Sequence, residues 1–149
     1  MNTHKRKSST ILVAEDDPDD RLLIQEAFYE NRLSHDFFFV EDGEELMDYL
    51  HQRGRCSAST PRPDLTLLDL NMPRKEGREA LAEIKTDPKL RQIPVVVLTT
   101  SRAEKDILHA YDIGAAGFTT KPVTFEGLAE VVRMLGRYWF EIVELPSYI

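Results

Sequence analysis

Five short apolar segments along the chain predict β-strands. Three of them are continuous runs of aliphatic residues, which are typical of strands buried on both faces of a parallel sheet. The other two are weaker candidates that contain phenylalanine or threonine. The expected strands cover residues 10–14, 37–40, 65–68, 95–98 and 117–120.

Amphipathic segments separate these strands, and apolar residues at every third or fourth position predict helices there. The first helix is expected to begin at Pro18, because Asp17 can cap a helix and proline is tolerated at the first helical position. The third is expected to end at Asp87 and the fourth at Gly114. The expected apolar faces contain Leu22, Leu23, Ala27 and Phe28; Leu46, Met47, Tyr49 and Leu50; Ala80, Leu81 and Ile84; Ile107, Leu108, Tyr111 and Ile113; and Leu128, Val131, Val132 and Leu135.

The alternation of five strands with five helices indicates an α/β fold, a doubly wound five-stranded parallel sheet with five helices. The length of 149 residues suits one such domain, and no internal repeat is visible. We divide the chain into a flexible basic tail at 1–9, the domain at 10–137 and an aromatic C-terminal extension at 138–149. Residues 51–63 are polar and predict a surface loop.

The net charge of -7 argues against general binding to nucleic acid or to an anionic membrane. No apolar run approaches the roughly 20 residues that a membrane span needs, and the polar start of the chain lacks the apolar core of a secretory signal. The single cysteine, Cys56, predicts an ordinary free thiol. The expected location is the cytoplasm.

Polar side chains follow four of the predicted strands. Glu15 and Asp16 come after the first strand, Asp69 after the third, Thr99 after the fourth and Lys121 after the fifth. The working crevice of an open parallel sheet lies beyond the carboxyl ends of its strands, so we expect these side chains to converge there.

Converging carboxylates repel each other unless a cation neutralises them. Mg²⁺ suits such a site because it prefers oxygen ligands and retains waters that a phosphate can displace. A carboxylate between a metal ion and the Lys121 ammonium is a reasonable nucleophile toward phosphorus. Acidic residues near the ends of strands also have ordinary explanations. Asp17 can cap a helix, and Asp19 and Asp20 are favoured by the dipole of the first helical turn.

The order and spacing of these residues resemble the receiver domains of response regulators over about residues 10–136. Each matching segment is weak alone, but the complete set in this order is specific. The resemblance implies a flavodoxin-like, CheY-like receiver fold with an extended C-terminal helix or tail. The matching segments are residues 11–18, 67–73 with Gly77 downstream, 97–101, 114–118 and 121–122.

The resemblance implies a metal-binding role for four residues. Asp69 would accept the phosphoryl group and also contact the ion. Asp16 would bind Mg²⁺ directly, and Glu15 would act through a metal-bound water. Asn71 would contribute its backbone carbonyl. Mn²⁺ or Ca²⁺ could occupy the same site.

The resemblance to receiver domains also implies a conformational switch. Thr99 would move to bond a phosphoryl oxygen, and Lys121 would pair with the phosphoryl group. The bond between Lys121 and Pro122 would be cis. Phe118 matches the aromatic switch position, although plain core packing explains it as well. Asp17 departs from the common pattern, which has a neutral residue there, and would either strengthen metal binding or slow phosphorylation.

A closer resemblance is to the small single-domain regulators of bacterial and cyanobacterial phytochromes. It is carried by residues 98–101, by the long loop before the third strand and by the aromatic tail that includes Tyr138, Trp139 and Phe140. An apolar tail that one copy struggles to cover suggests an interface. We expect a homodimer that uses the fourth helix, fifth strand, fifth helix and tail; the alternative is that the tail folds back on its own domain.

The expected function is that of a phosphorelay component. It takes a phosphoryl group from a histidine kinase, of phytochrome type, and signals by protein contact, with no output domain of its own. It is not expected to be an enzyme beyond self-catalysed phosphorylation and slow dephosphorylation. The alternatives are a phosphorylation-independent binding module and an aspartyl-phosphate phosphatase, which needs a second acid where Asn71 stands. Phosphate-binding glycine motifs of nucleotide-binding proteins are absent.

Overall fold

Five parallel strands form the single sheet of the computed structural model, which describes residues 9–30, 35–53, 60–72, 75–100, 103–122 and 124–139. The strands lie in the order β2-β1-β3-β4-β5, so the first strand lies second in the sheet and the chain winds from it in both directions. All five predicted strands are confirmed. They are β1 (Ser9–Ala14), β2 (His35–Val40), β3 (Leu65–Leu68), β4 (Val95–Thr99) and β5 (Gly117–Thr120).

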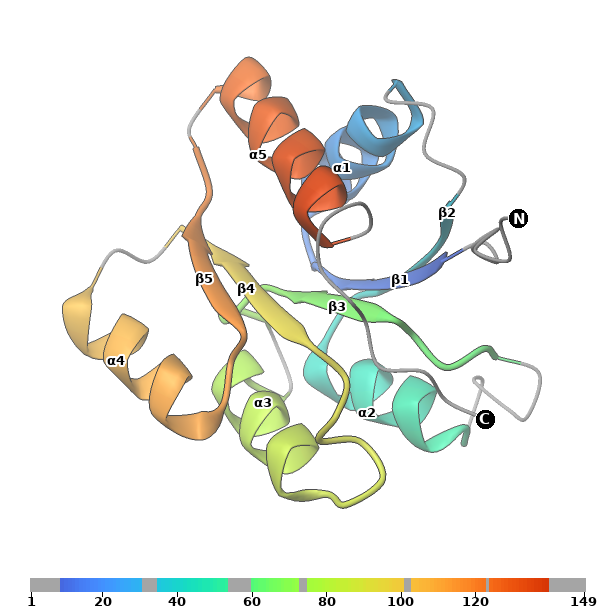
Figure 1. Ribbon diagram of the computed structural model, residues 1–149, viewed down its shortest axis with the longest axis vertical. Coiled ribbons are helices and arrows are strands. Elements are labelled where there is room, and N and C mark those ends of the chain that lie inside the picture. The colour runs from blue at the N-terminus through green and yellow to red at the C-terminus, as the bar shows by residue number, and fades with distance from the viewer. Residues whose placement is uncertain are drawn as a thin grey trace, which may run out of the picture.

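Five helices cover the two faces of the sheet (Figure 1). On one face, α1 (Pro18–Glu30) packs beside α5 (Phe125–Arg137). On the other lie α2 (Gly43–His51), α3 (Gly77–Thr86) and α4 (Glu104–Ile113). The doubly wound α/β prediction is therefore confirmed. Within the described part of the chain, no helix has the length and apolar character needed to span a membrane.

The sheet separates two apolar cores, which explains why its strands are apolar on both sides. In β1, Ile11 and Val13 belong to the core under α1 and α5, whereas Leu12 and Ala14 belong to the core under α2, α3 and α4. All four residues are almost completely buried. Burial on both faces fixes the register of the central strands, and with it the positions of the residues that follow them.

Two helices present faces that match the prediction only in part. In α1, Ala27 is buried and Leu23 packs against the core as expected, but Leu22 is 54% exposed and Ile24, which was not predicted, is completely buried. In α4, Leu108 and Tyr111 are 60% and 50% exposed, and only Ala110 is buried. Most of α4 is exposed because the helix lies beside the edge strand β5 and α3, which cover only a narrow stripe of it.

The end of α5 continues into the aromatic tail without a break. Tyr138 keeps helical backbone angles (φ -63°, ψ -50°) and is half exposed. Trp139 packs partly buried against the core under α1 and α5, and its ring meets that of Tyr138 edge-on. This residue therefore folds back on its own domain. Phe140, Cys56 and residues 1–8 lie outside the described residues, so the proposed division of the chain stays a prediction.

Candidate functional site

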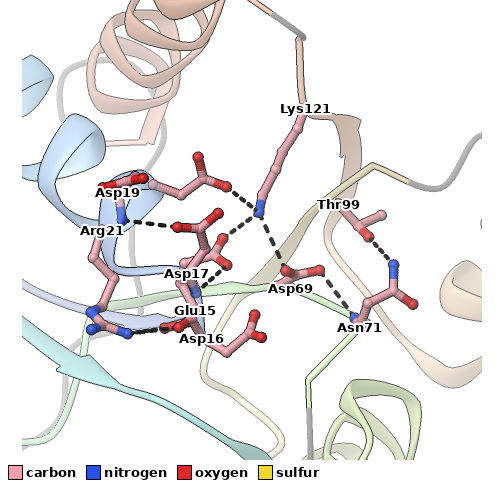
Figure 2. A network of polar contacts seen from close by, with 10 residues as sticks. Glu15, Asp16, Asp17, Asp19, Arg21, Asp69, Asn71, Thr99 and Lys121 are labelled. Carbon is pink, nitrogen blue, oxygen red and sulfur yellow. Dashed lines mark hydrogen bonds and ion pairs between the residues drawn. The ribbon is translucent and has the colours of Figure 1, made fainter.

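The carboxyl ends of the strands bring the predicted residues together at one edge of the sheet (Figure 2). Glu15 follows β1, Asp69 follows β3, Thr99 ends β4 and Lys121 follows β5. Backbone hydrogen bonds fix these positions: the Asp69 amide donates to the Ala14 carbonyl at 3.0 Å, and the Lys121 amide donates to the Thr99 carbonyl at 2.7 Å. The convergence expected from parallel-sheet geometry is thus confirmed.

Lys121 is the centre of the site. Its side chain is only 6% exposed, and its ammonium forms ion pairs with three carboxylates. It contacts Glu15, lies 2.9 Å from Asp20 Oδ2 and lies 3.3 Å from Asp69 Oδ2. One buried cation therefore holds together acids from β1, α1 and β3.

The electrostatics of the site are dominated by burial. Removal from water raises the pKa of the Glu15 carboxyl to about 8; the charge of Asp69 acts in the same direction, while Lys121 opposes it. For Lys121, burial acts to lower the pKa, but its bonds and charge contacts with Glu15, Asp69 and Asp20 outweigh burial and raise the pKa. Lys121 therefore stays an ammonium at neutral pH, beside an excess of negative charge.

Three carboxylates are placed to bind a cation. One oxygen from each of Glu15, Asp16 and Asp69 lies within 4.8 Å of the others. Glu15 and Asp69 are buried, whereas Asp16 is exposed and so reaches the solvent side of the cluster. An all-oxygen set that is partly open to water fits Mg²⁺, which binds few protein carboxylates and keeps several waters.

The loop between β1 and α1 is held in place by its own side chains. The Asp17 carboxylate accepts a hydrogen bond from the Asp19 amide at 2.9 Å, so the interpretation of Asp17 as the helix cap is confirmed. The Arg21 guanidinium donates to the backbone carbonyls of Glu15 at 2.9 Å and Asp16 at 3.2 Å. These bonds set the direction in which the acidic pair points.

The loop after β3 ties Asp69 to Thr99. The backbone amide of Asn71 donates to Asp69 Oδ1 at 3.0 Å, and its side-chain amide donates to the fully buried Thr99 Oγ1 at 3.3 Å. Gly77 begins α3 so close to this loop that a Cβ there would lie 2.5 Å from the Asp69 carbonyl oxygen. The metal contact through the Asn71 carbonyl stays a prediction.

Two predictions about the β5 side of the site have different outcomes. No peptide bond between described residues is cis, so the predicted cis bond between Lys121 and Pro122 is wrong. The trans form is the default even before proline, by about 0.5–1 kcal/mol, and the contacts of Lys121 are made with it. Phe118 packs partly buried against the core under α2, α3 and α4, and its switch role stays a prediction.

Sequence reasoning missed the parts that Asp20 and Arg21 play. Asp20 was explained by the helix dipole, yet its carboxylate bonds to Lys121, which is 101 residues away. A signal was present, because a helix capped by Asp17 places Asp20 in its first turn, next to the acidic pair. Nothing in the local pattern identified Arg21.

Comparisons with known proteins agree with this geometry. Residues 11–133 match the response regulator receiver domain family. The chain is 40% identical to the response regulator Rcp1 of Synechocystis sp. (strain ATCC 27184 / PCC 6803 / Kazusa) over 147 residues, which cover 99% of each protein.

Two solved structures are also similar along most of their length. The phosphorylated cyanobacterial phytochrome response regulator RcpA superimposes with a TM-score of 0.90 at 45% identity, covering 95% of this chain and 100% of that one. The Mn²⁺-bound form of Rcp1 gives a TM-score of 0.88 at 41% identity, covering 93% and 99%. The chain therefore belongs to the response regulator receiver domain family and is a component of two-component signalling.

Proposed function

We propose that this receiver accepts a phosphoryl group on Asp69 from a histidine kinase and then signals through altered protein contacts. The observation that carries the proposal is the position of the Asp69 carboxylate, which clusters with the carboxylates of Glu15 and Asp16 and also lies 3.3 Å from the Lys121 ammonium. A phosphatase of the aspartyl-phosphate type would need a general acid at Asn71, whose amide instead donates to Thr99.

The transfer is a displacement at phosphorus. An oxygen of Asp69 attacks the phosphorus of a phosphohistidine, the new P–O bond forms as the P–N bond breaks, and the imidazole nitrogen leaves with the electron pair and takes up a proton. Lys121 Nζ, 3.3 Å from Asp69 Oδ2, can bind an oxygen of the transferring group and offset its charge. In this proposal the protein catalyses the transfer only onto its own Asp69, and it slowly hydrolyses the resulting acyl phosphate.

We propose Mg²⁺ as the ion at the carboxylate cluster, with Asp16, Asp69 and the Asn71 carbonyl as its protein ligands and Glu15 acting through a water. When bound, the ion supplies positive charge that neutralises the transferring phosphoryl group. The Mn²⁺-bound form of Rcp1 supports a divalent cation in a protein of this family. Mn²⁺ or Ca²⁺ could occupy the same oxygen set.

The signalling surface that we propose surrounds the edge strand β5. Exposed apolar side chains gather on the helices that flank it, where a lone copy leaves them in water. They are Leu108 and Tyr111 on α4, Phe125 and Met134 on α5, and Tyr138 at its end. We infer that two copies pair through this surface, and that phosphorylation changes the pairing through Thr99 at the end of β4 and Phe118 in β5.

The kinase partner that we propose is of the phytochrome type and the location is the cytoplasm. Support for the kinase comes from the similarity to RcpA, a phytochrome response regulator, over 95% of this chain. The experiment that tests the function is incubation of the purified protein with acetyl phosphate, with and without Mg²⁺, followed by intact-mass measurement. A gain of one phosphoryl group only with Mg²⁺ is expected; no gain from any donor would leave a phosphorylation-independent binding module.

Replacement of Thr99 by alanine is expected to uncouple phosphorylation from dimerisation. In this proposal the hydroxyl of Thr99 bonds a phosphoryl oxygen, whereas acceptance itself depends on Asp69, Lys121 and the metal. We expect Asp69 of T99A still to be phosphorylated, while the phosphate-dependent shift on a sizing column is lost. Thr100→Ala, at the exposed neighbouring position, is the control and should behave as wild type. A full shift in T99A would show that Thr99 does not couple the two events.

A further inference from the structure

The ammonium of Lys121 is fully engaged before any phosphate arrives. A lysine side chain has three N–H donors, and three carboxylates contact it: Glu15, Asp20 at 2.9 Å and Asp69 at 3.3 Å. Binding of a phosphoryl oxygen by Lys121 therefore requires one of these carboxylates to give up its place.

The three carboxylates differ in how easily they can leave. Asp69 is the attachment point, so it stays at the site and loses its charge when it becomes an acyl phosphate. Glu15 has a side chain only 2% exposed and belongs to the carboxylate cluster, so moving it would leave a buried polar group without its partner. Asp20 is 25% exposed and stands in the first turn of α1, outside that cluster. Its carboxylate can turn to water at the lowest cost.

We propose that Asp20 is a positioning residue that holds Lys121 in the unphosphorylated protein and is displaced by the phosphoryl group. This inference rests on phosphorylation of Asp69 as proposed above. Asp20 acts in two ways, because it competes for the Lys121 ammonium and its negative charge repels an incoming anion. The native protein therefore takes up phosphate more slowly than it would without this carboxylate, and Asp20 sets how readily the site is occupied.

The test is the variant Asp20→Asn, which keeps the shape of the side chain and removes its charge. Two quantities are measured with Mg²⁺ present: the rate of phosphorylation by acetyl phosphate, from intact mass, and the affinity for beryllofluoride, an unreactive phosphoryl mimic, by calorimetry. We expect both to rise about tenfold, which corresponds to about 1.4 kcal/mol. The rate should gain mainly through a lower apparent KM for the donor, because Asp20 acts on binding of the anion.

Two companion variants separate this role from others. Asp19→Asn removes the same charge from the adjacent exposed residue, whose backbone amide bonds to Asp17. It is expected to change either quantity by no more than about twofold, the size of a screened surface effect. Asp20→Glu restores a competing carboxylate and should return both quantities to within about threefold of wild type, since only tenths of a kcal/mol separate the two acids at a partly exposed site. If Asp20 had a purely structural role, its replacement would change the melting temperature, and the rate and the affinity would not depend on the charge at this position.

The outcomes distinguish this inference from the proposed function. Phosphorylation of wild type with an unchanged or slower D20N variant would overturn the role of Asp20 and leave the function standing. An equal gain in D19N would also overturn it, because general charge would then explain the effect. Absence of phosphate and beryllofluoride binding in wild type would remove both the function and the inference that depends on it.

Discussion

Replacement of Lys121 by methionine is expected to reduce phosphorylation of Asp69 by at least about 100-fold, the usual effect of losing one group that binds the charge of a transition state. The ammonium is 6% exposed and lies 3.3 Å from Asp69 Oδ2, where a phosphoryl oxygen would meet it. The rate with acetyl phosphate and Mg²⁺, followed by intact mass, measures the effect. Methionine retains much of the apolar stem, so the change isolates the charge.

The matched control is Lys105→Met, which removes an exposed lysine from α4 and should leave the rate unchanged. Lys121→Arg tests geometry, because a planar guanidinium keeps the charge but does not replace a compact ammonium among three carboxylates. It should fold as wild type and still be phosphorylated slowly. A rate for K121M within about threefold of wild type would contradict the electrostatic role assigned to Lys121.

Replacement of Asp16 by asparagine is expected to remove the stabilisation that Mg²⁺ gives to the folded protein. An ion present at 100 times its dissociation constant stabilises the fold by about 2.7 kcal/mol, which raises the melting temperature of a domain of this size by about 5–10 °C. Asp16 supplies one of three carboxylate oxygens within 4.8 Å of each other. Thermal unfolding with and without Mg²⁺ measures the shift, which D16N should lose.

The rise in melting temperature that Mg²⁺ causes is also expected to depend on pH. Metal binding needs an ionised Glu15, and burial raises the pKa of that carboxyl from 4.5 to about 8 in the metal-free protein. Because the raised pKa favours the protonated folded state, the metal-free protein loses stability as pH rises between these two values, while metal affinity grows. Asp19→Asn is the control and should keep the full shift. An undiminished shift in D16N would place the ion elsewhere.

The sheet and the site were predictable from sequence for one physical reason. Continuous apolar runs bounded by acids or proline are typical of strands buried on both faces of a parallel sheet, and residues 65–68 coincide with the buried strand β3. The weaker candidate at residues 117–120 coincides with β5. Parallel strands end at the same edge, so Asp69, Thr99 and Lys121 had to meet there. The family resemblance then gave each residue an expected role.

Other features depend on tertiary contacts that a local pattern does not contain. The spacing of Leu108 and Tyr111 predicts a helix with an apolar stripe, but it does not say whether the domain or another molecule covers that stripe. Asp20 satisfies the helix dipole equally well with or without Lys121, so its contact across 101 residues of chain was invisible. The trans bond before Pro122 departs from the conformation that the resemblance implied.

The measurement that tests the account most directly is the intact mass of wild type, Asp69→Asn and Asp48→Asn after incubation with acetyl phosphate and Mg²⁺. Asp48 is a carboxylate on α2, away from the cluster at the strand ends, and serves as the matched control. The account predicts one added phosphoryl group on wild type and D48N, located by peptide mapping to the segment with Asp69, and none on D69N. Equal phosphorylation of D69N and wild type would contradict it.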